Sequence, residues 1–350
     1  MKVILPCCGQ SSRYPGQPPK WMLEGHDRRP MLTLAVEDLG IDLDDLVVVI
    51  LREHDERFDA RSGIARAFGR EVHVEVLDEP TSSQAETVVR ALERCSLDEP
   101  FLVKDSDNSF ALDDLDSTSN YVSVDSLNNH DLINPRNKSY VRVDHNSSIV
   151  NIREKAVISD LFSVGGYFFT DPTEVRTYYE RLRGAGSPWD RELYLSDIIA
   201  AMLLDGIPFQ ARSVQRYQDW GTLHEWQRRL AVNRTVMVAL DGFLFERGSQ
   251  YFQPLYEDVT PHAAAVEAVV VARQAGRKVI ALSVRPQALA ELTRSQLAAV
   301  GLDGIEVVYD VPPTGWTMVT GPDPALPLRS GSALEALPDD PNLAAKLLDA

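Results

Sequence analysis

Short apolar runs alternate with amphipathic helical patterns through roughly the first 200 residues, and this alternation restricts the possible folds more than any other feature of the chain. The runs expected to form buried strands are 2–5, 46–51, 72–77 and 101–103. The stretches expected to form the helices between them are 31–39, 56–68 and 83–95. Repeated β-α-β units build a parallel sheet with helices on both faces, which binds ligands at the carboxyl ends of its strands. We therefore expect an α/β fold with its site at that edge.

The pattern changes twice along the chain. Residues 121–169 contain short alternating strands that suggest an antiparallel section capping the site, at 121–124, 139–143, 149–152 and 164–169. A second α/β rhythm begins near Asn233, with strands at 235–240, 278–282 and 305–309, and helices at 263–274 and 288–299. A short last helix is expected at 341–348. The sequence thus predicts two domains, 1–232 and 233–350.

Composition excludes several classes of protein. The chain has 350 residues, enough for two cores, and a net charge of -17, which argues against a nucleic-acid partner. That charge does not argue against a nucleotide, because a few local cations and a metal suffice to bind one. No apolar run approaches the ~20 residues of a membrane-spanning helix, and no signal-peptide pattern precedes the first strand. The three cysteines, Cys7, Cys8 and Cys95, fit neither a disulfide framework nor a zinc site. We expect a cytoplasmic protein without a membrane partner.

The first strand opens onto a loop of small residues that ends in a cation. The loop reads Cys8-Gly9-Gln10-Ser11-Ser12-Arg13, and Pro19-Lys20 follows it. Small residues let backbone N–H groups approach phosphate oxygens, and Arg13 and Lys20 can neutralise charge on them. The alternative is an ordinary loop with two cations near it, but its place directly after a strand favours a polyphosphate site.

Two acidic segments are candidates for holding a metal. The strand at 101–103 leads into Asp105-Ser106-Asp107, and a later segment contains Asp219-Trp220-Gly221-Thr222. Carboxylates at the end of a strand suit Mg²⁺, which prefers oxygen ligands. An Asp-x-Asp at a turn can also simply cap a helix. Thr222 and Glu225 can form a capping box, but that role does not explain Asp219.

These segments resemble, in order, the motifs of the sugar-phosphate nucleotidyltransferases. The family loop reads Leu-Ala-Ala-Gly-x-Gly-(Ser/Thr)-Arg followed by Pro-Lys, and Ser11 stands where the family has its second glycine. The family also has Asn-Gly-Asp and Asp-x-Gly-Thr, which Asp107 and Asp219 match. Weaker matches lie between them, at Ser83-Gln84, Arg153-Glu154-Lys155, Gly165-Gly166-Tyr167 and 190–197. The order of the motifs over residues 1 to about 230 favours the resemblance, because chance matches would not keep it.

The resemblance implies a Rossmann-like (GT-A-like) mixed-sheet domain that acts as a Mg²⁺-dependent nucleotidyltransferase of the EC 2.7.7 type. Such an enzyme transfers a nucleoside monophosphate from an NTP, here CTP, UTP or dTTP, to a small phosphorylated acceptor such as a sugar phosphate, and releases pyrophosphate. The implied residues are Arg13 and Lys20 for catalysis, Gly9, Gln10, Ser11, Ser12 and Gln84 for the nucleotide, Glu154, Lys155 and Gly166 for the acceptor, and Asp107 and Asp219 for the metal. The alternative is a catalytically silent nucleotide-binding regulatory protein, for which Ser11 leaves room.

The second domain resembles the haloacid-dehalogenase-like phosphatases. The segment Val238-Ala239-Leu240-Asp241-Gly242 is similar to their first motif, and Ser283 lies where their second motif holds phosphate. The family's nucleophilic aspartate is replaced by Ala239, and no lysine occurs between Lys278 and Lys346 to supply the family's downstream cation. We expect this small α/β domain to be inactive, with a structural role such as a homo-oligomer contact or a cover for the first domain.

Overall fold

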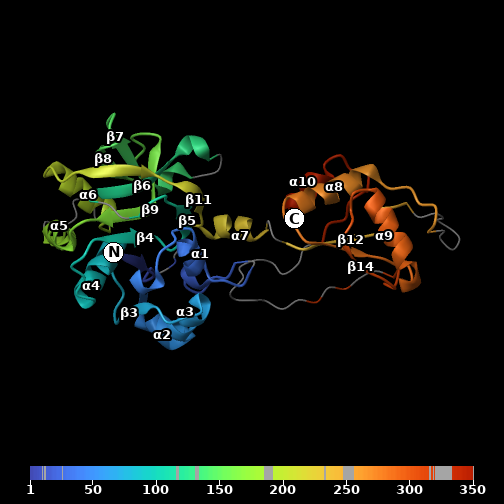
Figure 1. The fold of residues 1–350 in the computed structure, drawn as a ribbon, viewed down its shortest axis with the longest axis horizontal. Helices are drawn as coiled ribbons and strands as arrows, with labels where there is room; N and C mark the ends of the chain where they lie inside the picture. Colours follow the sequence, from blue (N-terminus) through green and yellow to red (C-terminus); the bar gives the residue numbers. More distant parts are fainter. Residues whose placement is uncertain are drawn as a thin grey trace. The chain divides into compact units, whose positions relative to one another are not determined.

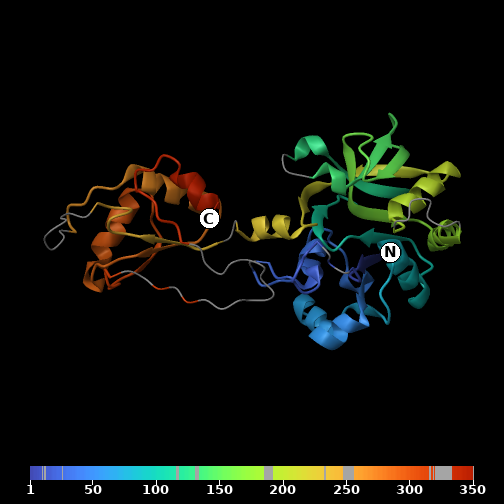
Figure 2. The same ribbon diagram turned by 180° about the vertical axis from the view of Figure 1, so that it is seen from behind.

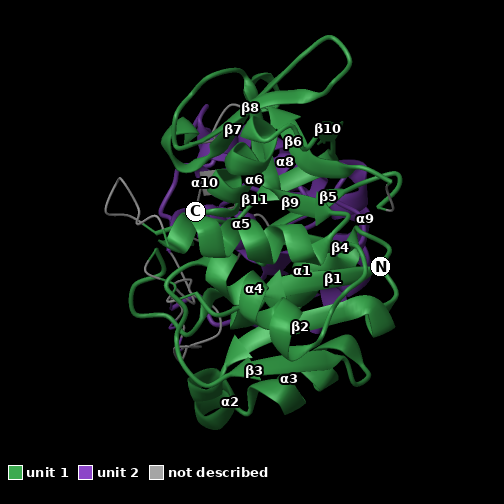
Figure 3. Cartoon of the chain, turned by 90° about the vertical axis from the view of Figure 1, so that its left-hand side faces the viewer, with its two compact units in different colours: residues 1–223 green, residues 224–350 purple. Residues whose placement is uncertain are grey.

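The computed structural model describes residues 1–9, 11, 13–25, 27–115, 118–130, 134–184, 192–231, 234–246, 256–314, 317, 319 and 333–349. The chain divides into two compact units, Met1–Leu223 (unit 1) and His224–Ala350 (unit 2) (Figure 3). The sequence analysis places the domain boundary after residue 232, so the two divisions differ in the segment 224–232.

Unit 1 is built on one mixed sheet with the strand order β10-β6-β9-β4-β1-β2-β3. Its parallel part consists of β1 (Lys2–Pro6), β2 (Leu46–Leu51), β3 (His73–Leu77) and β4 (Phe101–Lys104). The antiparallel part begins with β9 (Leu161–Phe169), which pairs with both β4 and β6 (Asn120–Ser126). Strand β10 (Phe209–Ser213) pairs parallel with β6. Strands β7 (Ser139–Val143) and β8 (Ile149–Glu154) pair antiparallel with each other, and β7 also pairs with β9. The expected mixed α/β sheet is confirmed.

Helices cover both faces of this sheet, as the sequence predicts. Successive strand residues face opposite sides, so Ile4 packs with one layer of side chains, and Val3 and Leu5 pack with the other. The first layer contains α4 (Gln84–Arg94), α5 (Pro172–Gly184) and α6 (Leu195–Leu204). The second contains α1 (Met31–Glu37) and α3 (Ala60–Phe68). The antiparallel pair β7–β8 lies at the end of unit 1 opposite α2 and α3 (Figure 1 and, from behind, Figure 2).

One expected helix is two helices. The stretch 56–68 is divided between α2 (Arg52–Phe58) and α3, and Asp59 between them has a positive φ of 51°. Aspartate tolerates this left-handed conformation better than most residues do. The prediction of a single helix is therefore wrong at Asp59, because the apolar spacing continues past a residue whose left-handed backbone ends α2.

A small two-stranded ladder lies outside the main sheet and carries site residues. It pairs β5 (Asn108–Ala111) antiparallel with β11 (Gln215–Asp219), and α7 (Leu223–Ala231) follows β11. Single 3₁₀ turns occur at η1 (Lys20–Met22), η2 (Leu43–Asp45), η3 (Leu127–Asn129) and η4 (Pro135–Asn137).

Unit 2 contains a parallel sheet in the order β12-β13-β14. Its strands are β12 (Val236–Ala239), β13 (Val279–Leu282) and β14 (Glu306–Val308), and its helices are α8 (Ala263–Gln274), α9 (Ala290–Ala299) and α10 (Leu343–Asp349), with a 3₁₀ turn η5 (Gln287–Leu289). The strands and helices expected here are confirmed to within a few residues. In the described part of the chain, none of the helices has both the length and the apolar character needed to cross a bilayer.

Candidate active site

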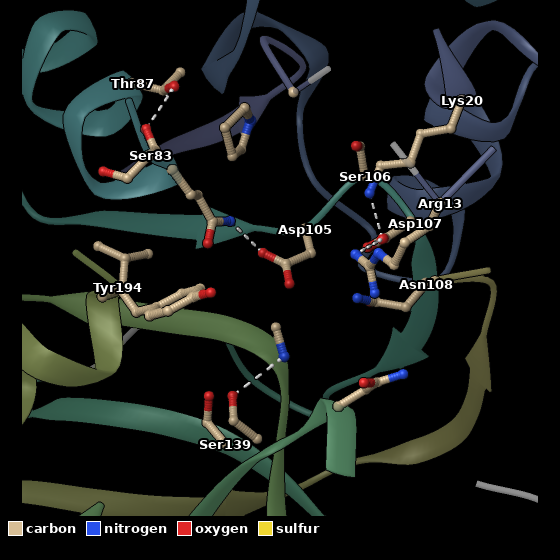
Figure 4. Close-up of a pocket in the computed structure, with 18 of the residues that line it drawn as sticks. Arg13, Lys20, Ser83, Thr87, Asp105, Ser106, Asp107, Asn108, Ser139 and Tyr194 are labelled. Carbon is tan, nitrogen blue, oxygen red and sulfur yellow. Dashed lines mark hydrogen bonds and ion pairs between the residues drawn. The ribbon is translucent and has the colours of Figure 1, made fainter. Parts of the chain in front are cut away.

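A pocket of about 630 Å³ opens in unit 1 beyond the carboxyl ends of β1 and β4. In Figure 4, Arg13, Lys20 and Asp107 lie together on one side of it, and Ser83, Tyr194 and Ser139 lie across from them. The predicted site residues that line the pocket are Gly9, Ser11, Arg13, Lys20, Gln84, Asp107, Glu154, Lys155 and Asp219. Gln10 and Ser12 lie outside the described residues. The structure thus brings residues from the whole length of unit 1 to one place.

In the loop after β1, Ser11 stands where the family pattern has its second glycine, and the structure accommodates it. Ser11 has a positive φ of 51°, a conformation that glycine adopts at no steric cost. Its carbonyl accepts from the Tyr14 N–H at 2.7 Å, and its hydroxyl accepts from the Lys20 N–H at 2.9 Å. The serine therefore adds a hydrogen bond, which a glycine could not make, between the loop and the segment that carries Lys20.

Two cations converge on Asp107. The Lys20 ammonium donates to this carboxylate, and an Arg13 guanidinium nitrogen lies 3.6 Å from the same oxygen. Burial alone would raise the pKa of Asp107, but Lys20 and Arg13 outweigh burial and lower it well below its usual range. Asp107 is therefore ionised, and the half-exposed Arg13 side chain faces the pocket.

The second carboxylate, Asp219, is brought to the first by the β5–β11 ladder. Asp219 pairs in register with Asn108, the residue after Asp107, and the Trp220 N–H donates to the Asp107 carbonyl at 2.9 Å. A Cβ placed on Gly221 would lie 3.2 Å from an Asp219 carboxylate oxygen and 3.8 Å from an Asp107 carboxylate oxygen. Both carboxylates thus face one small region of the pocket.

The opposite end of the pocket presents hydroxyl, carboxylate and ammonium groups. Glu154 accepts from the hydroxyls of Ser139 and Ser196, the latter at 2.9 Å. Lys155 donates to the Tyr194 hydroxyl at 2.6 Å, and its ammonium lies 4.6 Å from the centre of the Tyr194 ring. Glu154 and Lys155 therefore both reach the pocket, although neighbouring residues of a strand face opposite sides, because Lys155 follows the end of β8 with a φ of 54°.

Of the two adjacent glycines on β9, Gly165 lines the pocket and Gly166 does not. A Cβ on Gly166 would instead meet the Ser123 hydroxyl at 2.5 Å and the Phe110 ring at 2.7 Å. Strand alternation turns Gly166 toward the packed interior, so the Gly166 position predicted for the acceptor does not line this pocket, whereas that of Gly165 does.

Gly165 makes room for Asp105, whose carboxylate points into the pocket in Figure 4. Burial and the nearby Asp107 raise the pKa of Asp105 to about 6. Gln84 donates its amide N–H to Asp105, and Ser83 caps α4 by accepting from the Glu86 N–H at 3.2 Å. Since a carboxylate only accepts, this contact fixes the Gln84 amide with its N–H groups toward Asp105.

Gly165→Ala is expected to destabilise unit 1 by about 2 kcal/mol or more, because the backbone strain adds to a steric clash. Gly165 has a φ of 82°, and an added Cβ would lie 2.3 Å from an Asp105 oxygen. Urea unfolding measures the loss. Gly40→Ala is the matched control, since Gly40 has a φ of 62° and nothing within 4 Å of its Cβ position. Equal costs for the two substitutions would contradict the clash.

Comparison of the whole chain with known proteins finds likeness in structure only. The chain matches no protein-family model and no curated protein. Its structure is similar to a nucleoside-diphosphate-sugar pyrophosphorylase from Vibrio cholerae, with 21% identity, a TM-score of 0.54, and coverage of 65% of this chain and 99% of that one. It is also similar to the inositol-1-phosphate CTP transferase from T. maritima, with 17% identity, a TM-score of 0.51, and coverage of 64% and 90%. Unit 1 shares the fold of these structures.

A third similar structure comes from Bacillus anthracis and is assigned as a glucose-1-phosphate thymidylyltransferase, in complex with a sucrose. It has 21% identity, a TM-score of 0.52, and coverage of 66% of this chain and 94% of that one. The share of this chain that is covered in the three comparisons corresponds to the length of unit 1. The fold predicted from the motif order is therefore confirmed for unit 1, and the comparisons give no corresponding support for unit 2.

Within unit 1, two lysines occupy places that no motif predicts. Lys104, the last residue of β4, is fully buried, and burial lowers its pKa to about 7. Its ammonium donates to the Asp105 carbonyl at 2.7 Å, the Asn108 carbonyl at 2.9 Å and the Asn108 side chain. These hydrogen bonds stabilise the turn that carries Asp105 and Asp107. Lys138 precedes β7 and donates to the Asp219 carboxylate.

Three further residues around the loop, Cys7, Cys8 and Trp21, have structural roles. Cys7 and Cys8 are buried, and burial raises the pKa of both thiols, that of Cys8 to about 12. A thiol with so high a pKa is not a nucleophile at neutral pH. Trp21 is buried in the core layer next to α1 and lies 5.9 Å from the His54 ring, so it anchors the loop onto the sheet.

Proposed function

We propose that unit 1 transfers a nucleoside monophosphate from an NTP to a small phosphorylated acceptor and releases pyrophosphate. The observation that carries this proposal is the convergence of Arg13, Lys20, Asp107 and Asp219 in one pocket, at the end of a sheet with the nucleotidyltransferase fold. Cations for a polyphosphate and carboxylates for a metal are the groups that nucleotidyl transfer requires.

Each side chain has a role in this reaction. Arg13 and the backbone N–H groups of the loop bind the triphosphate, and Lys20 bridges the α-phosphate and the attacking phosphate of the acceptor. An acceptor phosphate oxygen forms the new bond to the α-phosphorus, while the bond from that phosphorus to the leaving pyrophosphate breaks. No general base is required, because the acceptor phosphate is already an anion at pH 7. Glu154 and Lys155 bind the acceptor, because the family motif that they resemble contacts the sugar and the phosphate of the acceptor.

The chemistry of the donor set fits Mg²⁺. Asp107 and Asp219 offer hard oxygen ligands that face the same region, and the pocket has room for the water molecules that this ion usually keeps. Held by these two residues, the ion would supply positive charge against the charge that develops at the α-phosphate.

The similar structures suggest the class of substrates. One is named as a CTP transferase for inositol-1-phosphate, and another is assigned as a thymidylyltransferase for glucose-1-phosphate. We infer that this protein likewise uses a pyrimidine nucleotide, CTP, UTP or dTTP, and the phosphate ester of a polyhydroxylated molecule. The hydroxyl and carboxylate groups around Glu154 suit hydrogen bonds to such hydroxyls.

A pyrophosphate-release screen tests the proposal. CTP, UTP, dTTP, ATP and GTP are each combined with a panel of phosphorylated sugars, polyols and alcohols in the presence of Mg²⁺. Release with at least one pair, accompanied by formation of the matching nucleotide ester, is the expected result. Tight NTP binding without release across the panel would contradict it and favour a nucleotide-binding regulatory protein.

For unit 2 we infer a haloacid-dehalogenase-like fold without phosphatase activity. Ala239 ends β12 at the position of the family's nucleophile. The remaining acid, Asp241, is 6% exposed and accepts from Arg285 at 2.8 Å through one oxygen and from Ser283 at 3.0 Å through the other. Both carboxylate oxygens thus have internal partners, and freeing them would leave the fully buried Arg285 without its counter-ion.

We expect the full-length protein to release no phosphate from p-nitrophenyl phosphate above the buffer rate, because a methyl group at position 239 cannot attack phosphorus. Malachite-green detection of phosphate, with and without Mg²⁺ over a pH range of about 5 to 9, measures this release. Mg²⁺-dependent release that disappears in Asp241→Asn would overturn the inference.

A further inference from the structure

Lys138 lies in the site although no motif points to it. It follows η4 and precedes β7, and its side chain is only 12% exposed. Its ammonium donates to the carboxylate of Asp219 and to the hydroxyl oxygen of Tyr217 at 2.8 Å. It also lies 5.4 Å from the centre of the Tyr217 ring and 5.7 Å from that of Phe162. Lys138 is therefore held by Asp219 and Tyr217 of β11 and lies near the ring of Phe162.

The carboxylates of Asp107 and Asp219, which both lie near Gly221, each have an ammonium partner. Lys20 pairs with Asp107, and Lys138 pairs with Asp219. The four side chains are between 11% and 18% exposed, so an unpaired charge among them would be costly. The lysines thus hold the two carboxylates in place before any ligand enters.

This arrangement conflicts with a divalent cation at the same carboxylates. Lys138 donates to one carboxylate oxygen of Asp219, and the Gly221 N–H donates to the other at 3.1 Å. A metal ion on Asp219 would therefore lie close to the Lys138 ammonium, and two cations beside one carboxylate repel each other strongly in a partly buried site. The Lys138 ammonium has another partner within reach, because the Tyr217 hydroxyl already accepts from it. It can leave Asp219 and remain in the pocket.

We propose that Lys138 is an exchangeable counter-ion: it pairs with Asp219 in the metal-free site and, when a divalent cation takes that carboxylate, becomes the ligand for a phosphate group of the acceptor. The proposal rests on the proposed function for the identity of that phosphate. A phosphate monoester carries about two negative charges at pH 7. Lys138 would place a positive charge beside the metal, on the Asp219 side of the site, while Lys20 and Arg13 supply it on the Asp107 side.

The first half of the proposal is tested by metal binding alone. Mn²⁺ is titrated into the full-length protein, and free Mn²⁺ is measured by electron paramagnetic resonance. Lys138→Met removes the competing ammonium and should bind Mn²⁺ about tenfold more tightly than the wild type. Lys138→Arg introduces a bidentate competitor and should bind it about threefold more weakly. Lys278→Met, which removes an exposed partner of Glu306 in unit 2, is the matched control and should change nothing.

Thermal unfolding gives a second readout of the same step. Lys138→Met removes the ammonium partner of a carboxylate that is only 15% exposed. This variant should therefore unfold at a lower temperature than the wild type without metal and regain most of that loss in excess Mn²⁺. If Lys138→Met does not fold, the Lys138→Arg titration decides. Mn²⁺ affinity in Lys138→Arg that equals or exceeds that of the wild type would overturn the exchange.

The second half is tested with inorganic phosphate as the probe. At saturating Mg²⁺, calorimetry should show phosphate binding at least about tenfold weaker in Lys138→Met than in the wild type, because the cation that binds the phosphate is removed. Without Mg²⁺, phosphate should bind the wild type poorly. Unchanged phosphate binding in Lys138→Met would overturn the acceptor role. Neither readout requires transfer activity, so failure of the proposed function would appear separately, as an absence of pyrophosphate release.

Discussion

Asp107→Asn and Asp219→Asn are each expected to lower kcat by about 10²-fold or more while leaving unit 1 folded. Each substitution removes a charged oxygen ligand from the region that both residues face, yet keeps the shape of the side chain. It also leaves an ammonium, Lys20 or Lys138, without its carboxylate. Raising the Mg²⁺ concentration should recover part of the loss if the defect is in metal binding.

Steady-state pyrophosphate release, with the best substrate pair from the screen, measures this effect, and circular dichroism checks the fold. Asp98→Asn is the matched control, because Asp98 forms an ion pair with Arg176 at 3.0 Å but is 81% exposed and does not line the pocket. It should retain wild-type turnover. Wild-type turnover of Asp107→Asn or Asp219→Asn at limiting Mg²⁺ would remove that residue from the catalytic site.

Lys20→Ala should lower kcat by about 10²-fold and change the dissociation constant of the NTP by no more than about threefold. The reason is that a cation between the two phosphates interacts most strongly when the α-phosphate gains negative charge in the transition state. Arg13→Ala, by contrast, should weaken NTP binding and turnover together, because Arg13 binds the triphosphate before and during the reaction.

Calorimetry gives the NTP affinity, and single-turnover kinetics give the rate of transfer. Lys2→Ala is the matched control, since Lys2 pairs with Asp45 at 3.3 Å outside the pocket. A Lys20→Ala enzyme that loses only NTP affinity, with kcat preserved, would show that Lys20 does not bridge the reacting phosphates.

The elements of the fold that could be predicted from the sequence are those with a strong local pattern. The apolar run at 46–51 forms β2 with the same bounds, and all six residues are buried. A strand buried on both faces leaves a continuous apolar run, which is readable without knowing its neighbours. The break at Asp59 between α2 and α3 has no such signal, because a left-handed residue leaves the apolar spacing on either side intact.

Site residues were predictable where a motif ties chemistry to a fixed place in the chain. Arg13 and Lys20 follow the first strand at the family's spacing, and both line the pocket. Lys138 and Lys104 carry no motif, and a lysine is most often a solvent-exposed residue. The role of Lys138 arises from its contact with Asp219, which is distant in the sequence and comes near only once the chain has folded. Lys104 contacts its near neighbours Asp105 and Asn108, and it is the burial of this lysine that the sequence does not reveal.

During synthesis, a chain that has not yet reached residue 219 cannot complete the site, because the second carboxylate is delivered by the last strand of unit 1. Pairing β11 with β5 closes a long loop, and contacts that close long loops tend to form late in folding. Lys20 and Lys138 precede Asp219 in the chain, so both cations are synthesised before the last negative charge arrives. When β11 pairs with β5, the carboxylates of Asp107 and Asp219 therefore come together with both lysines present in the chain, and the positive charge of these lysines lowers the electrostatic repulsion in this last step of folding.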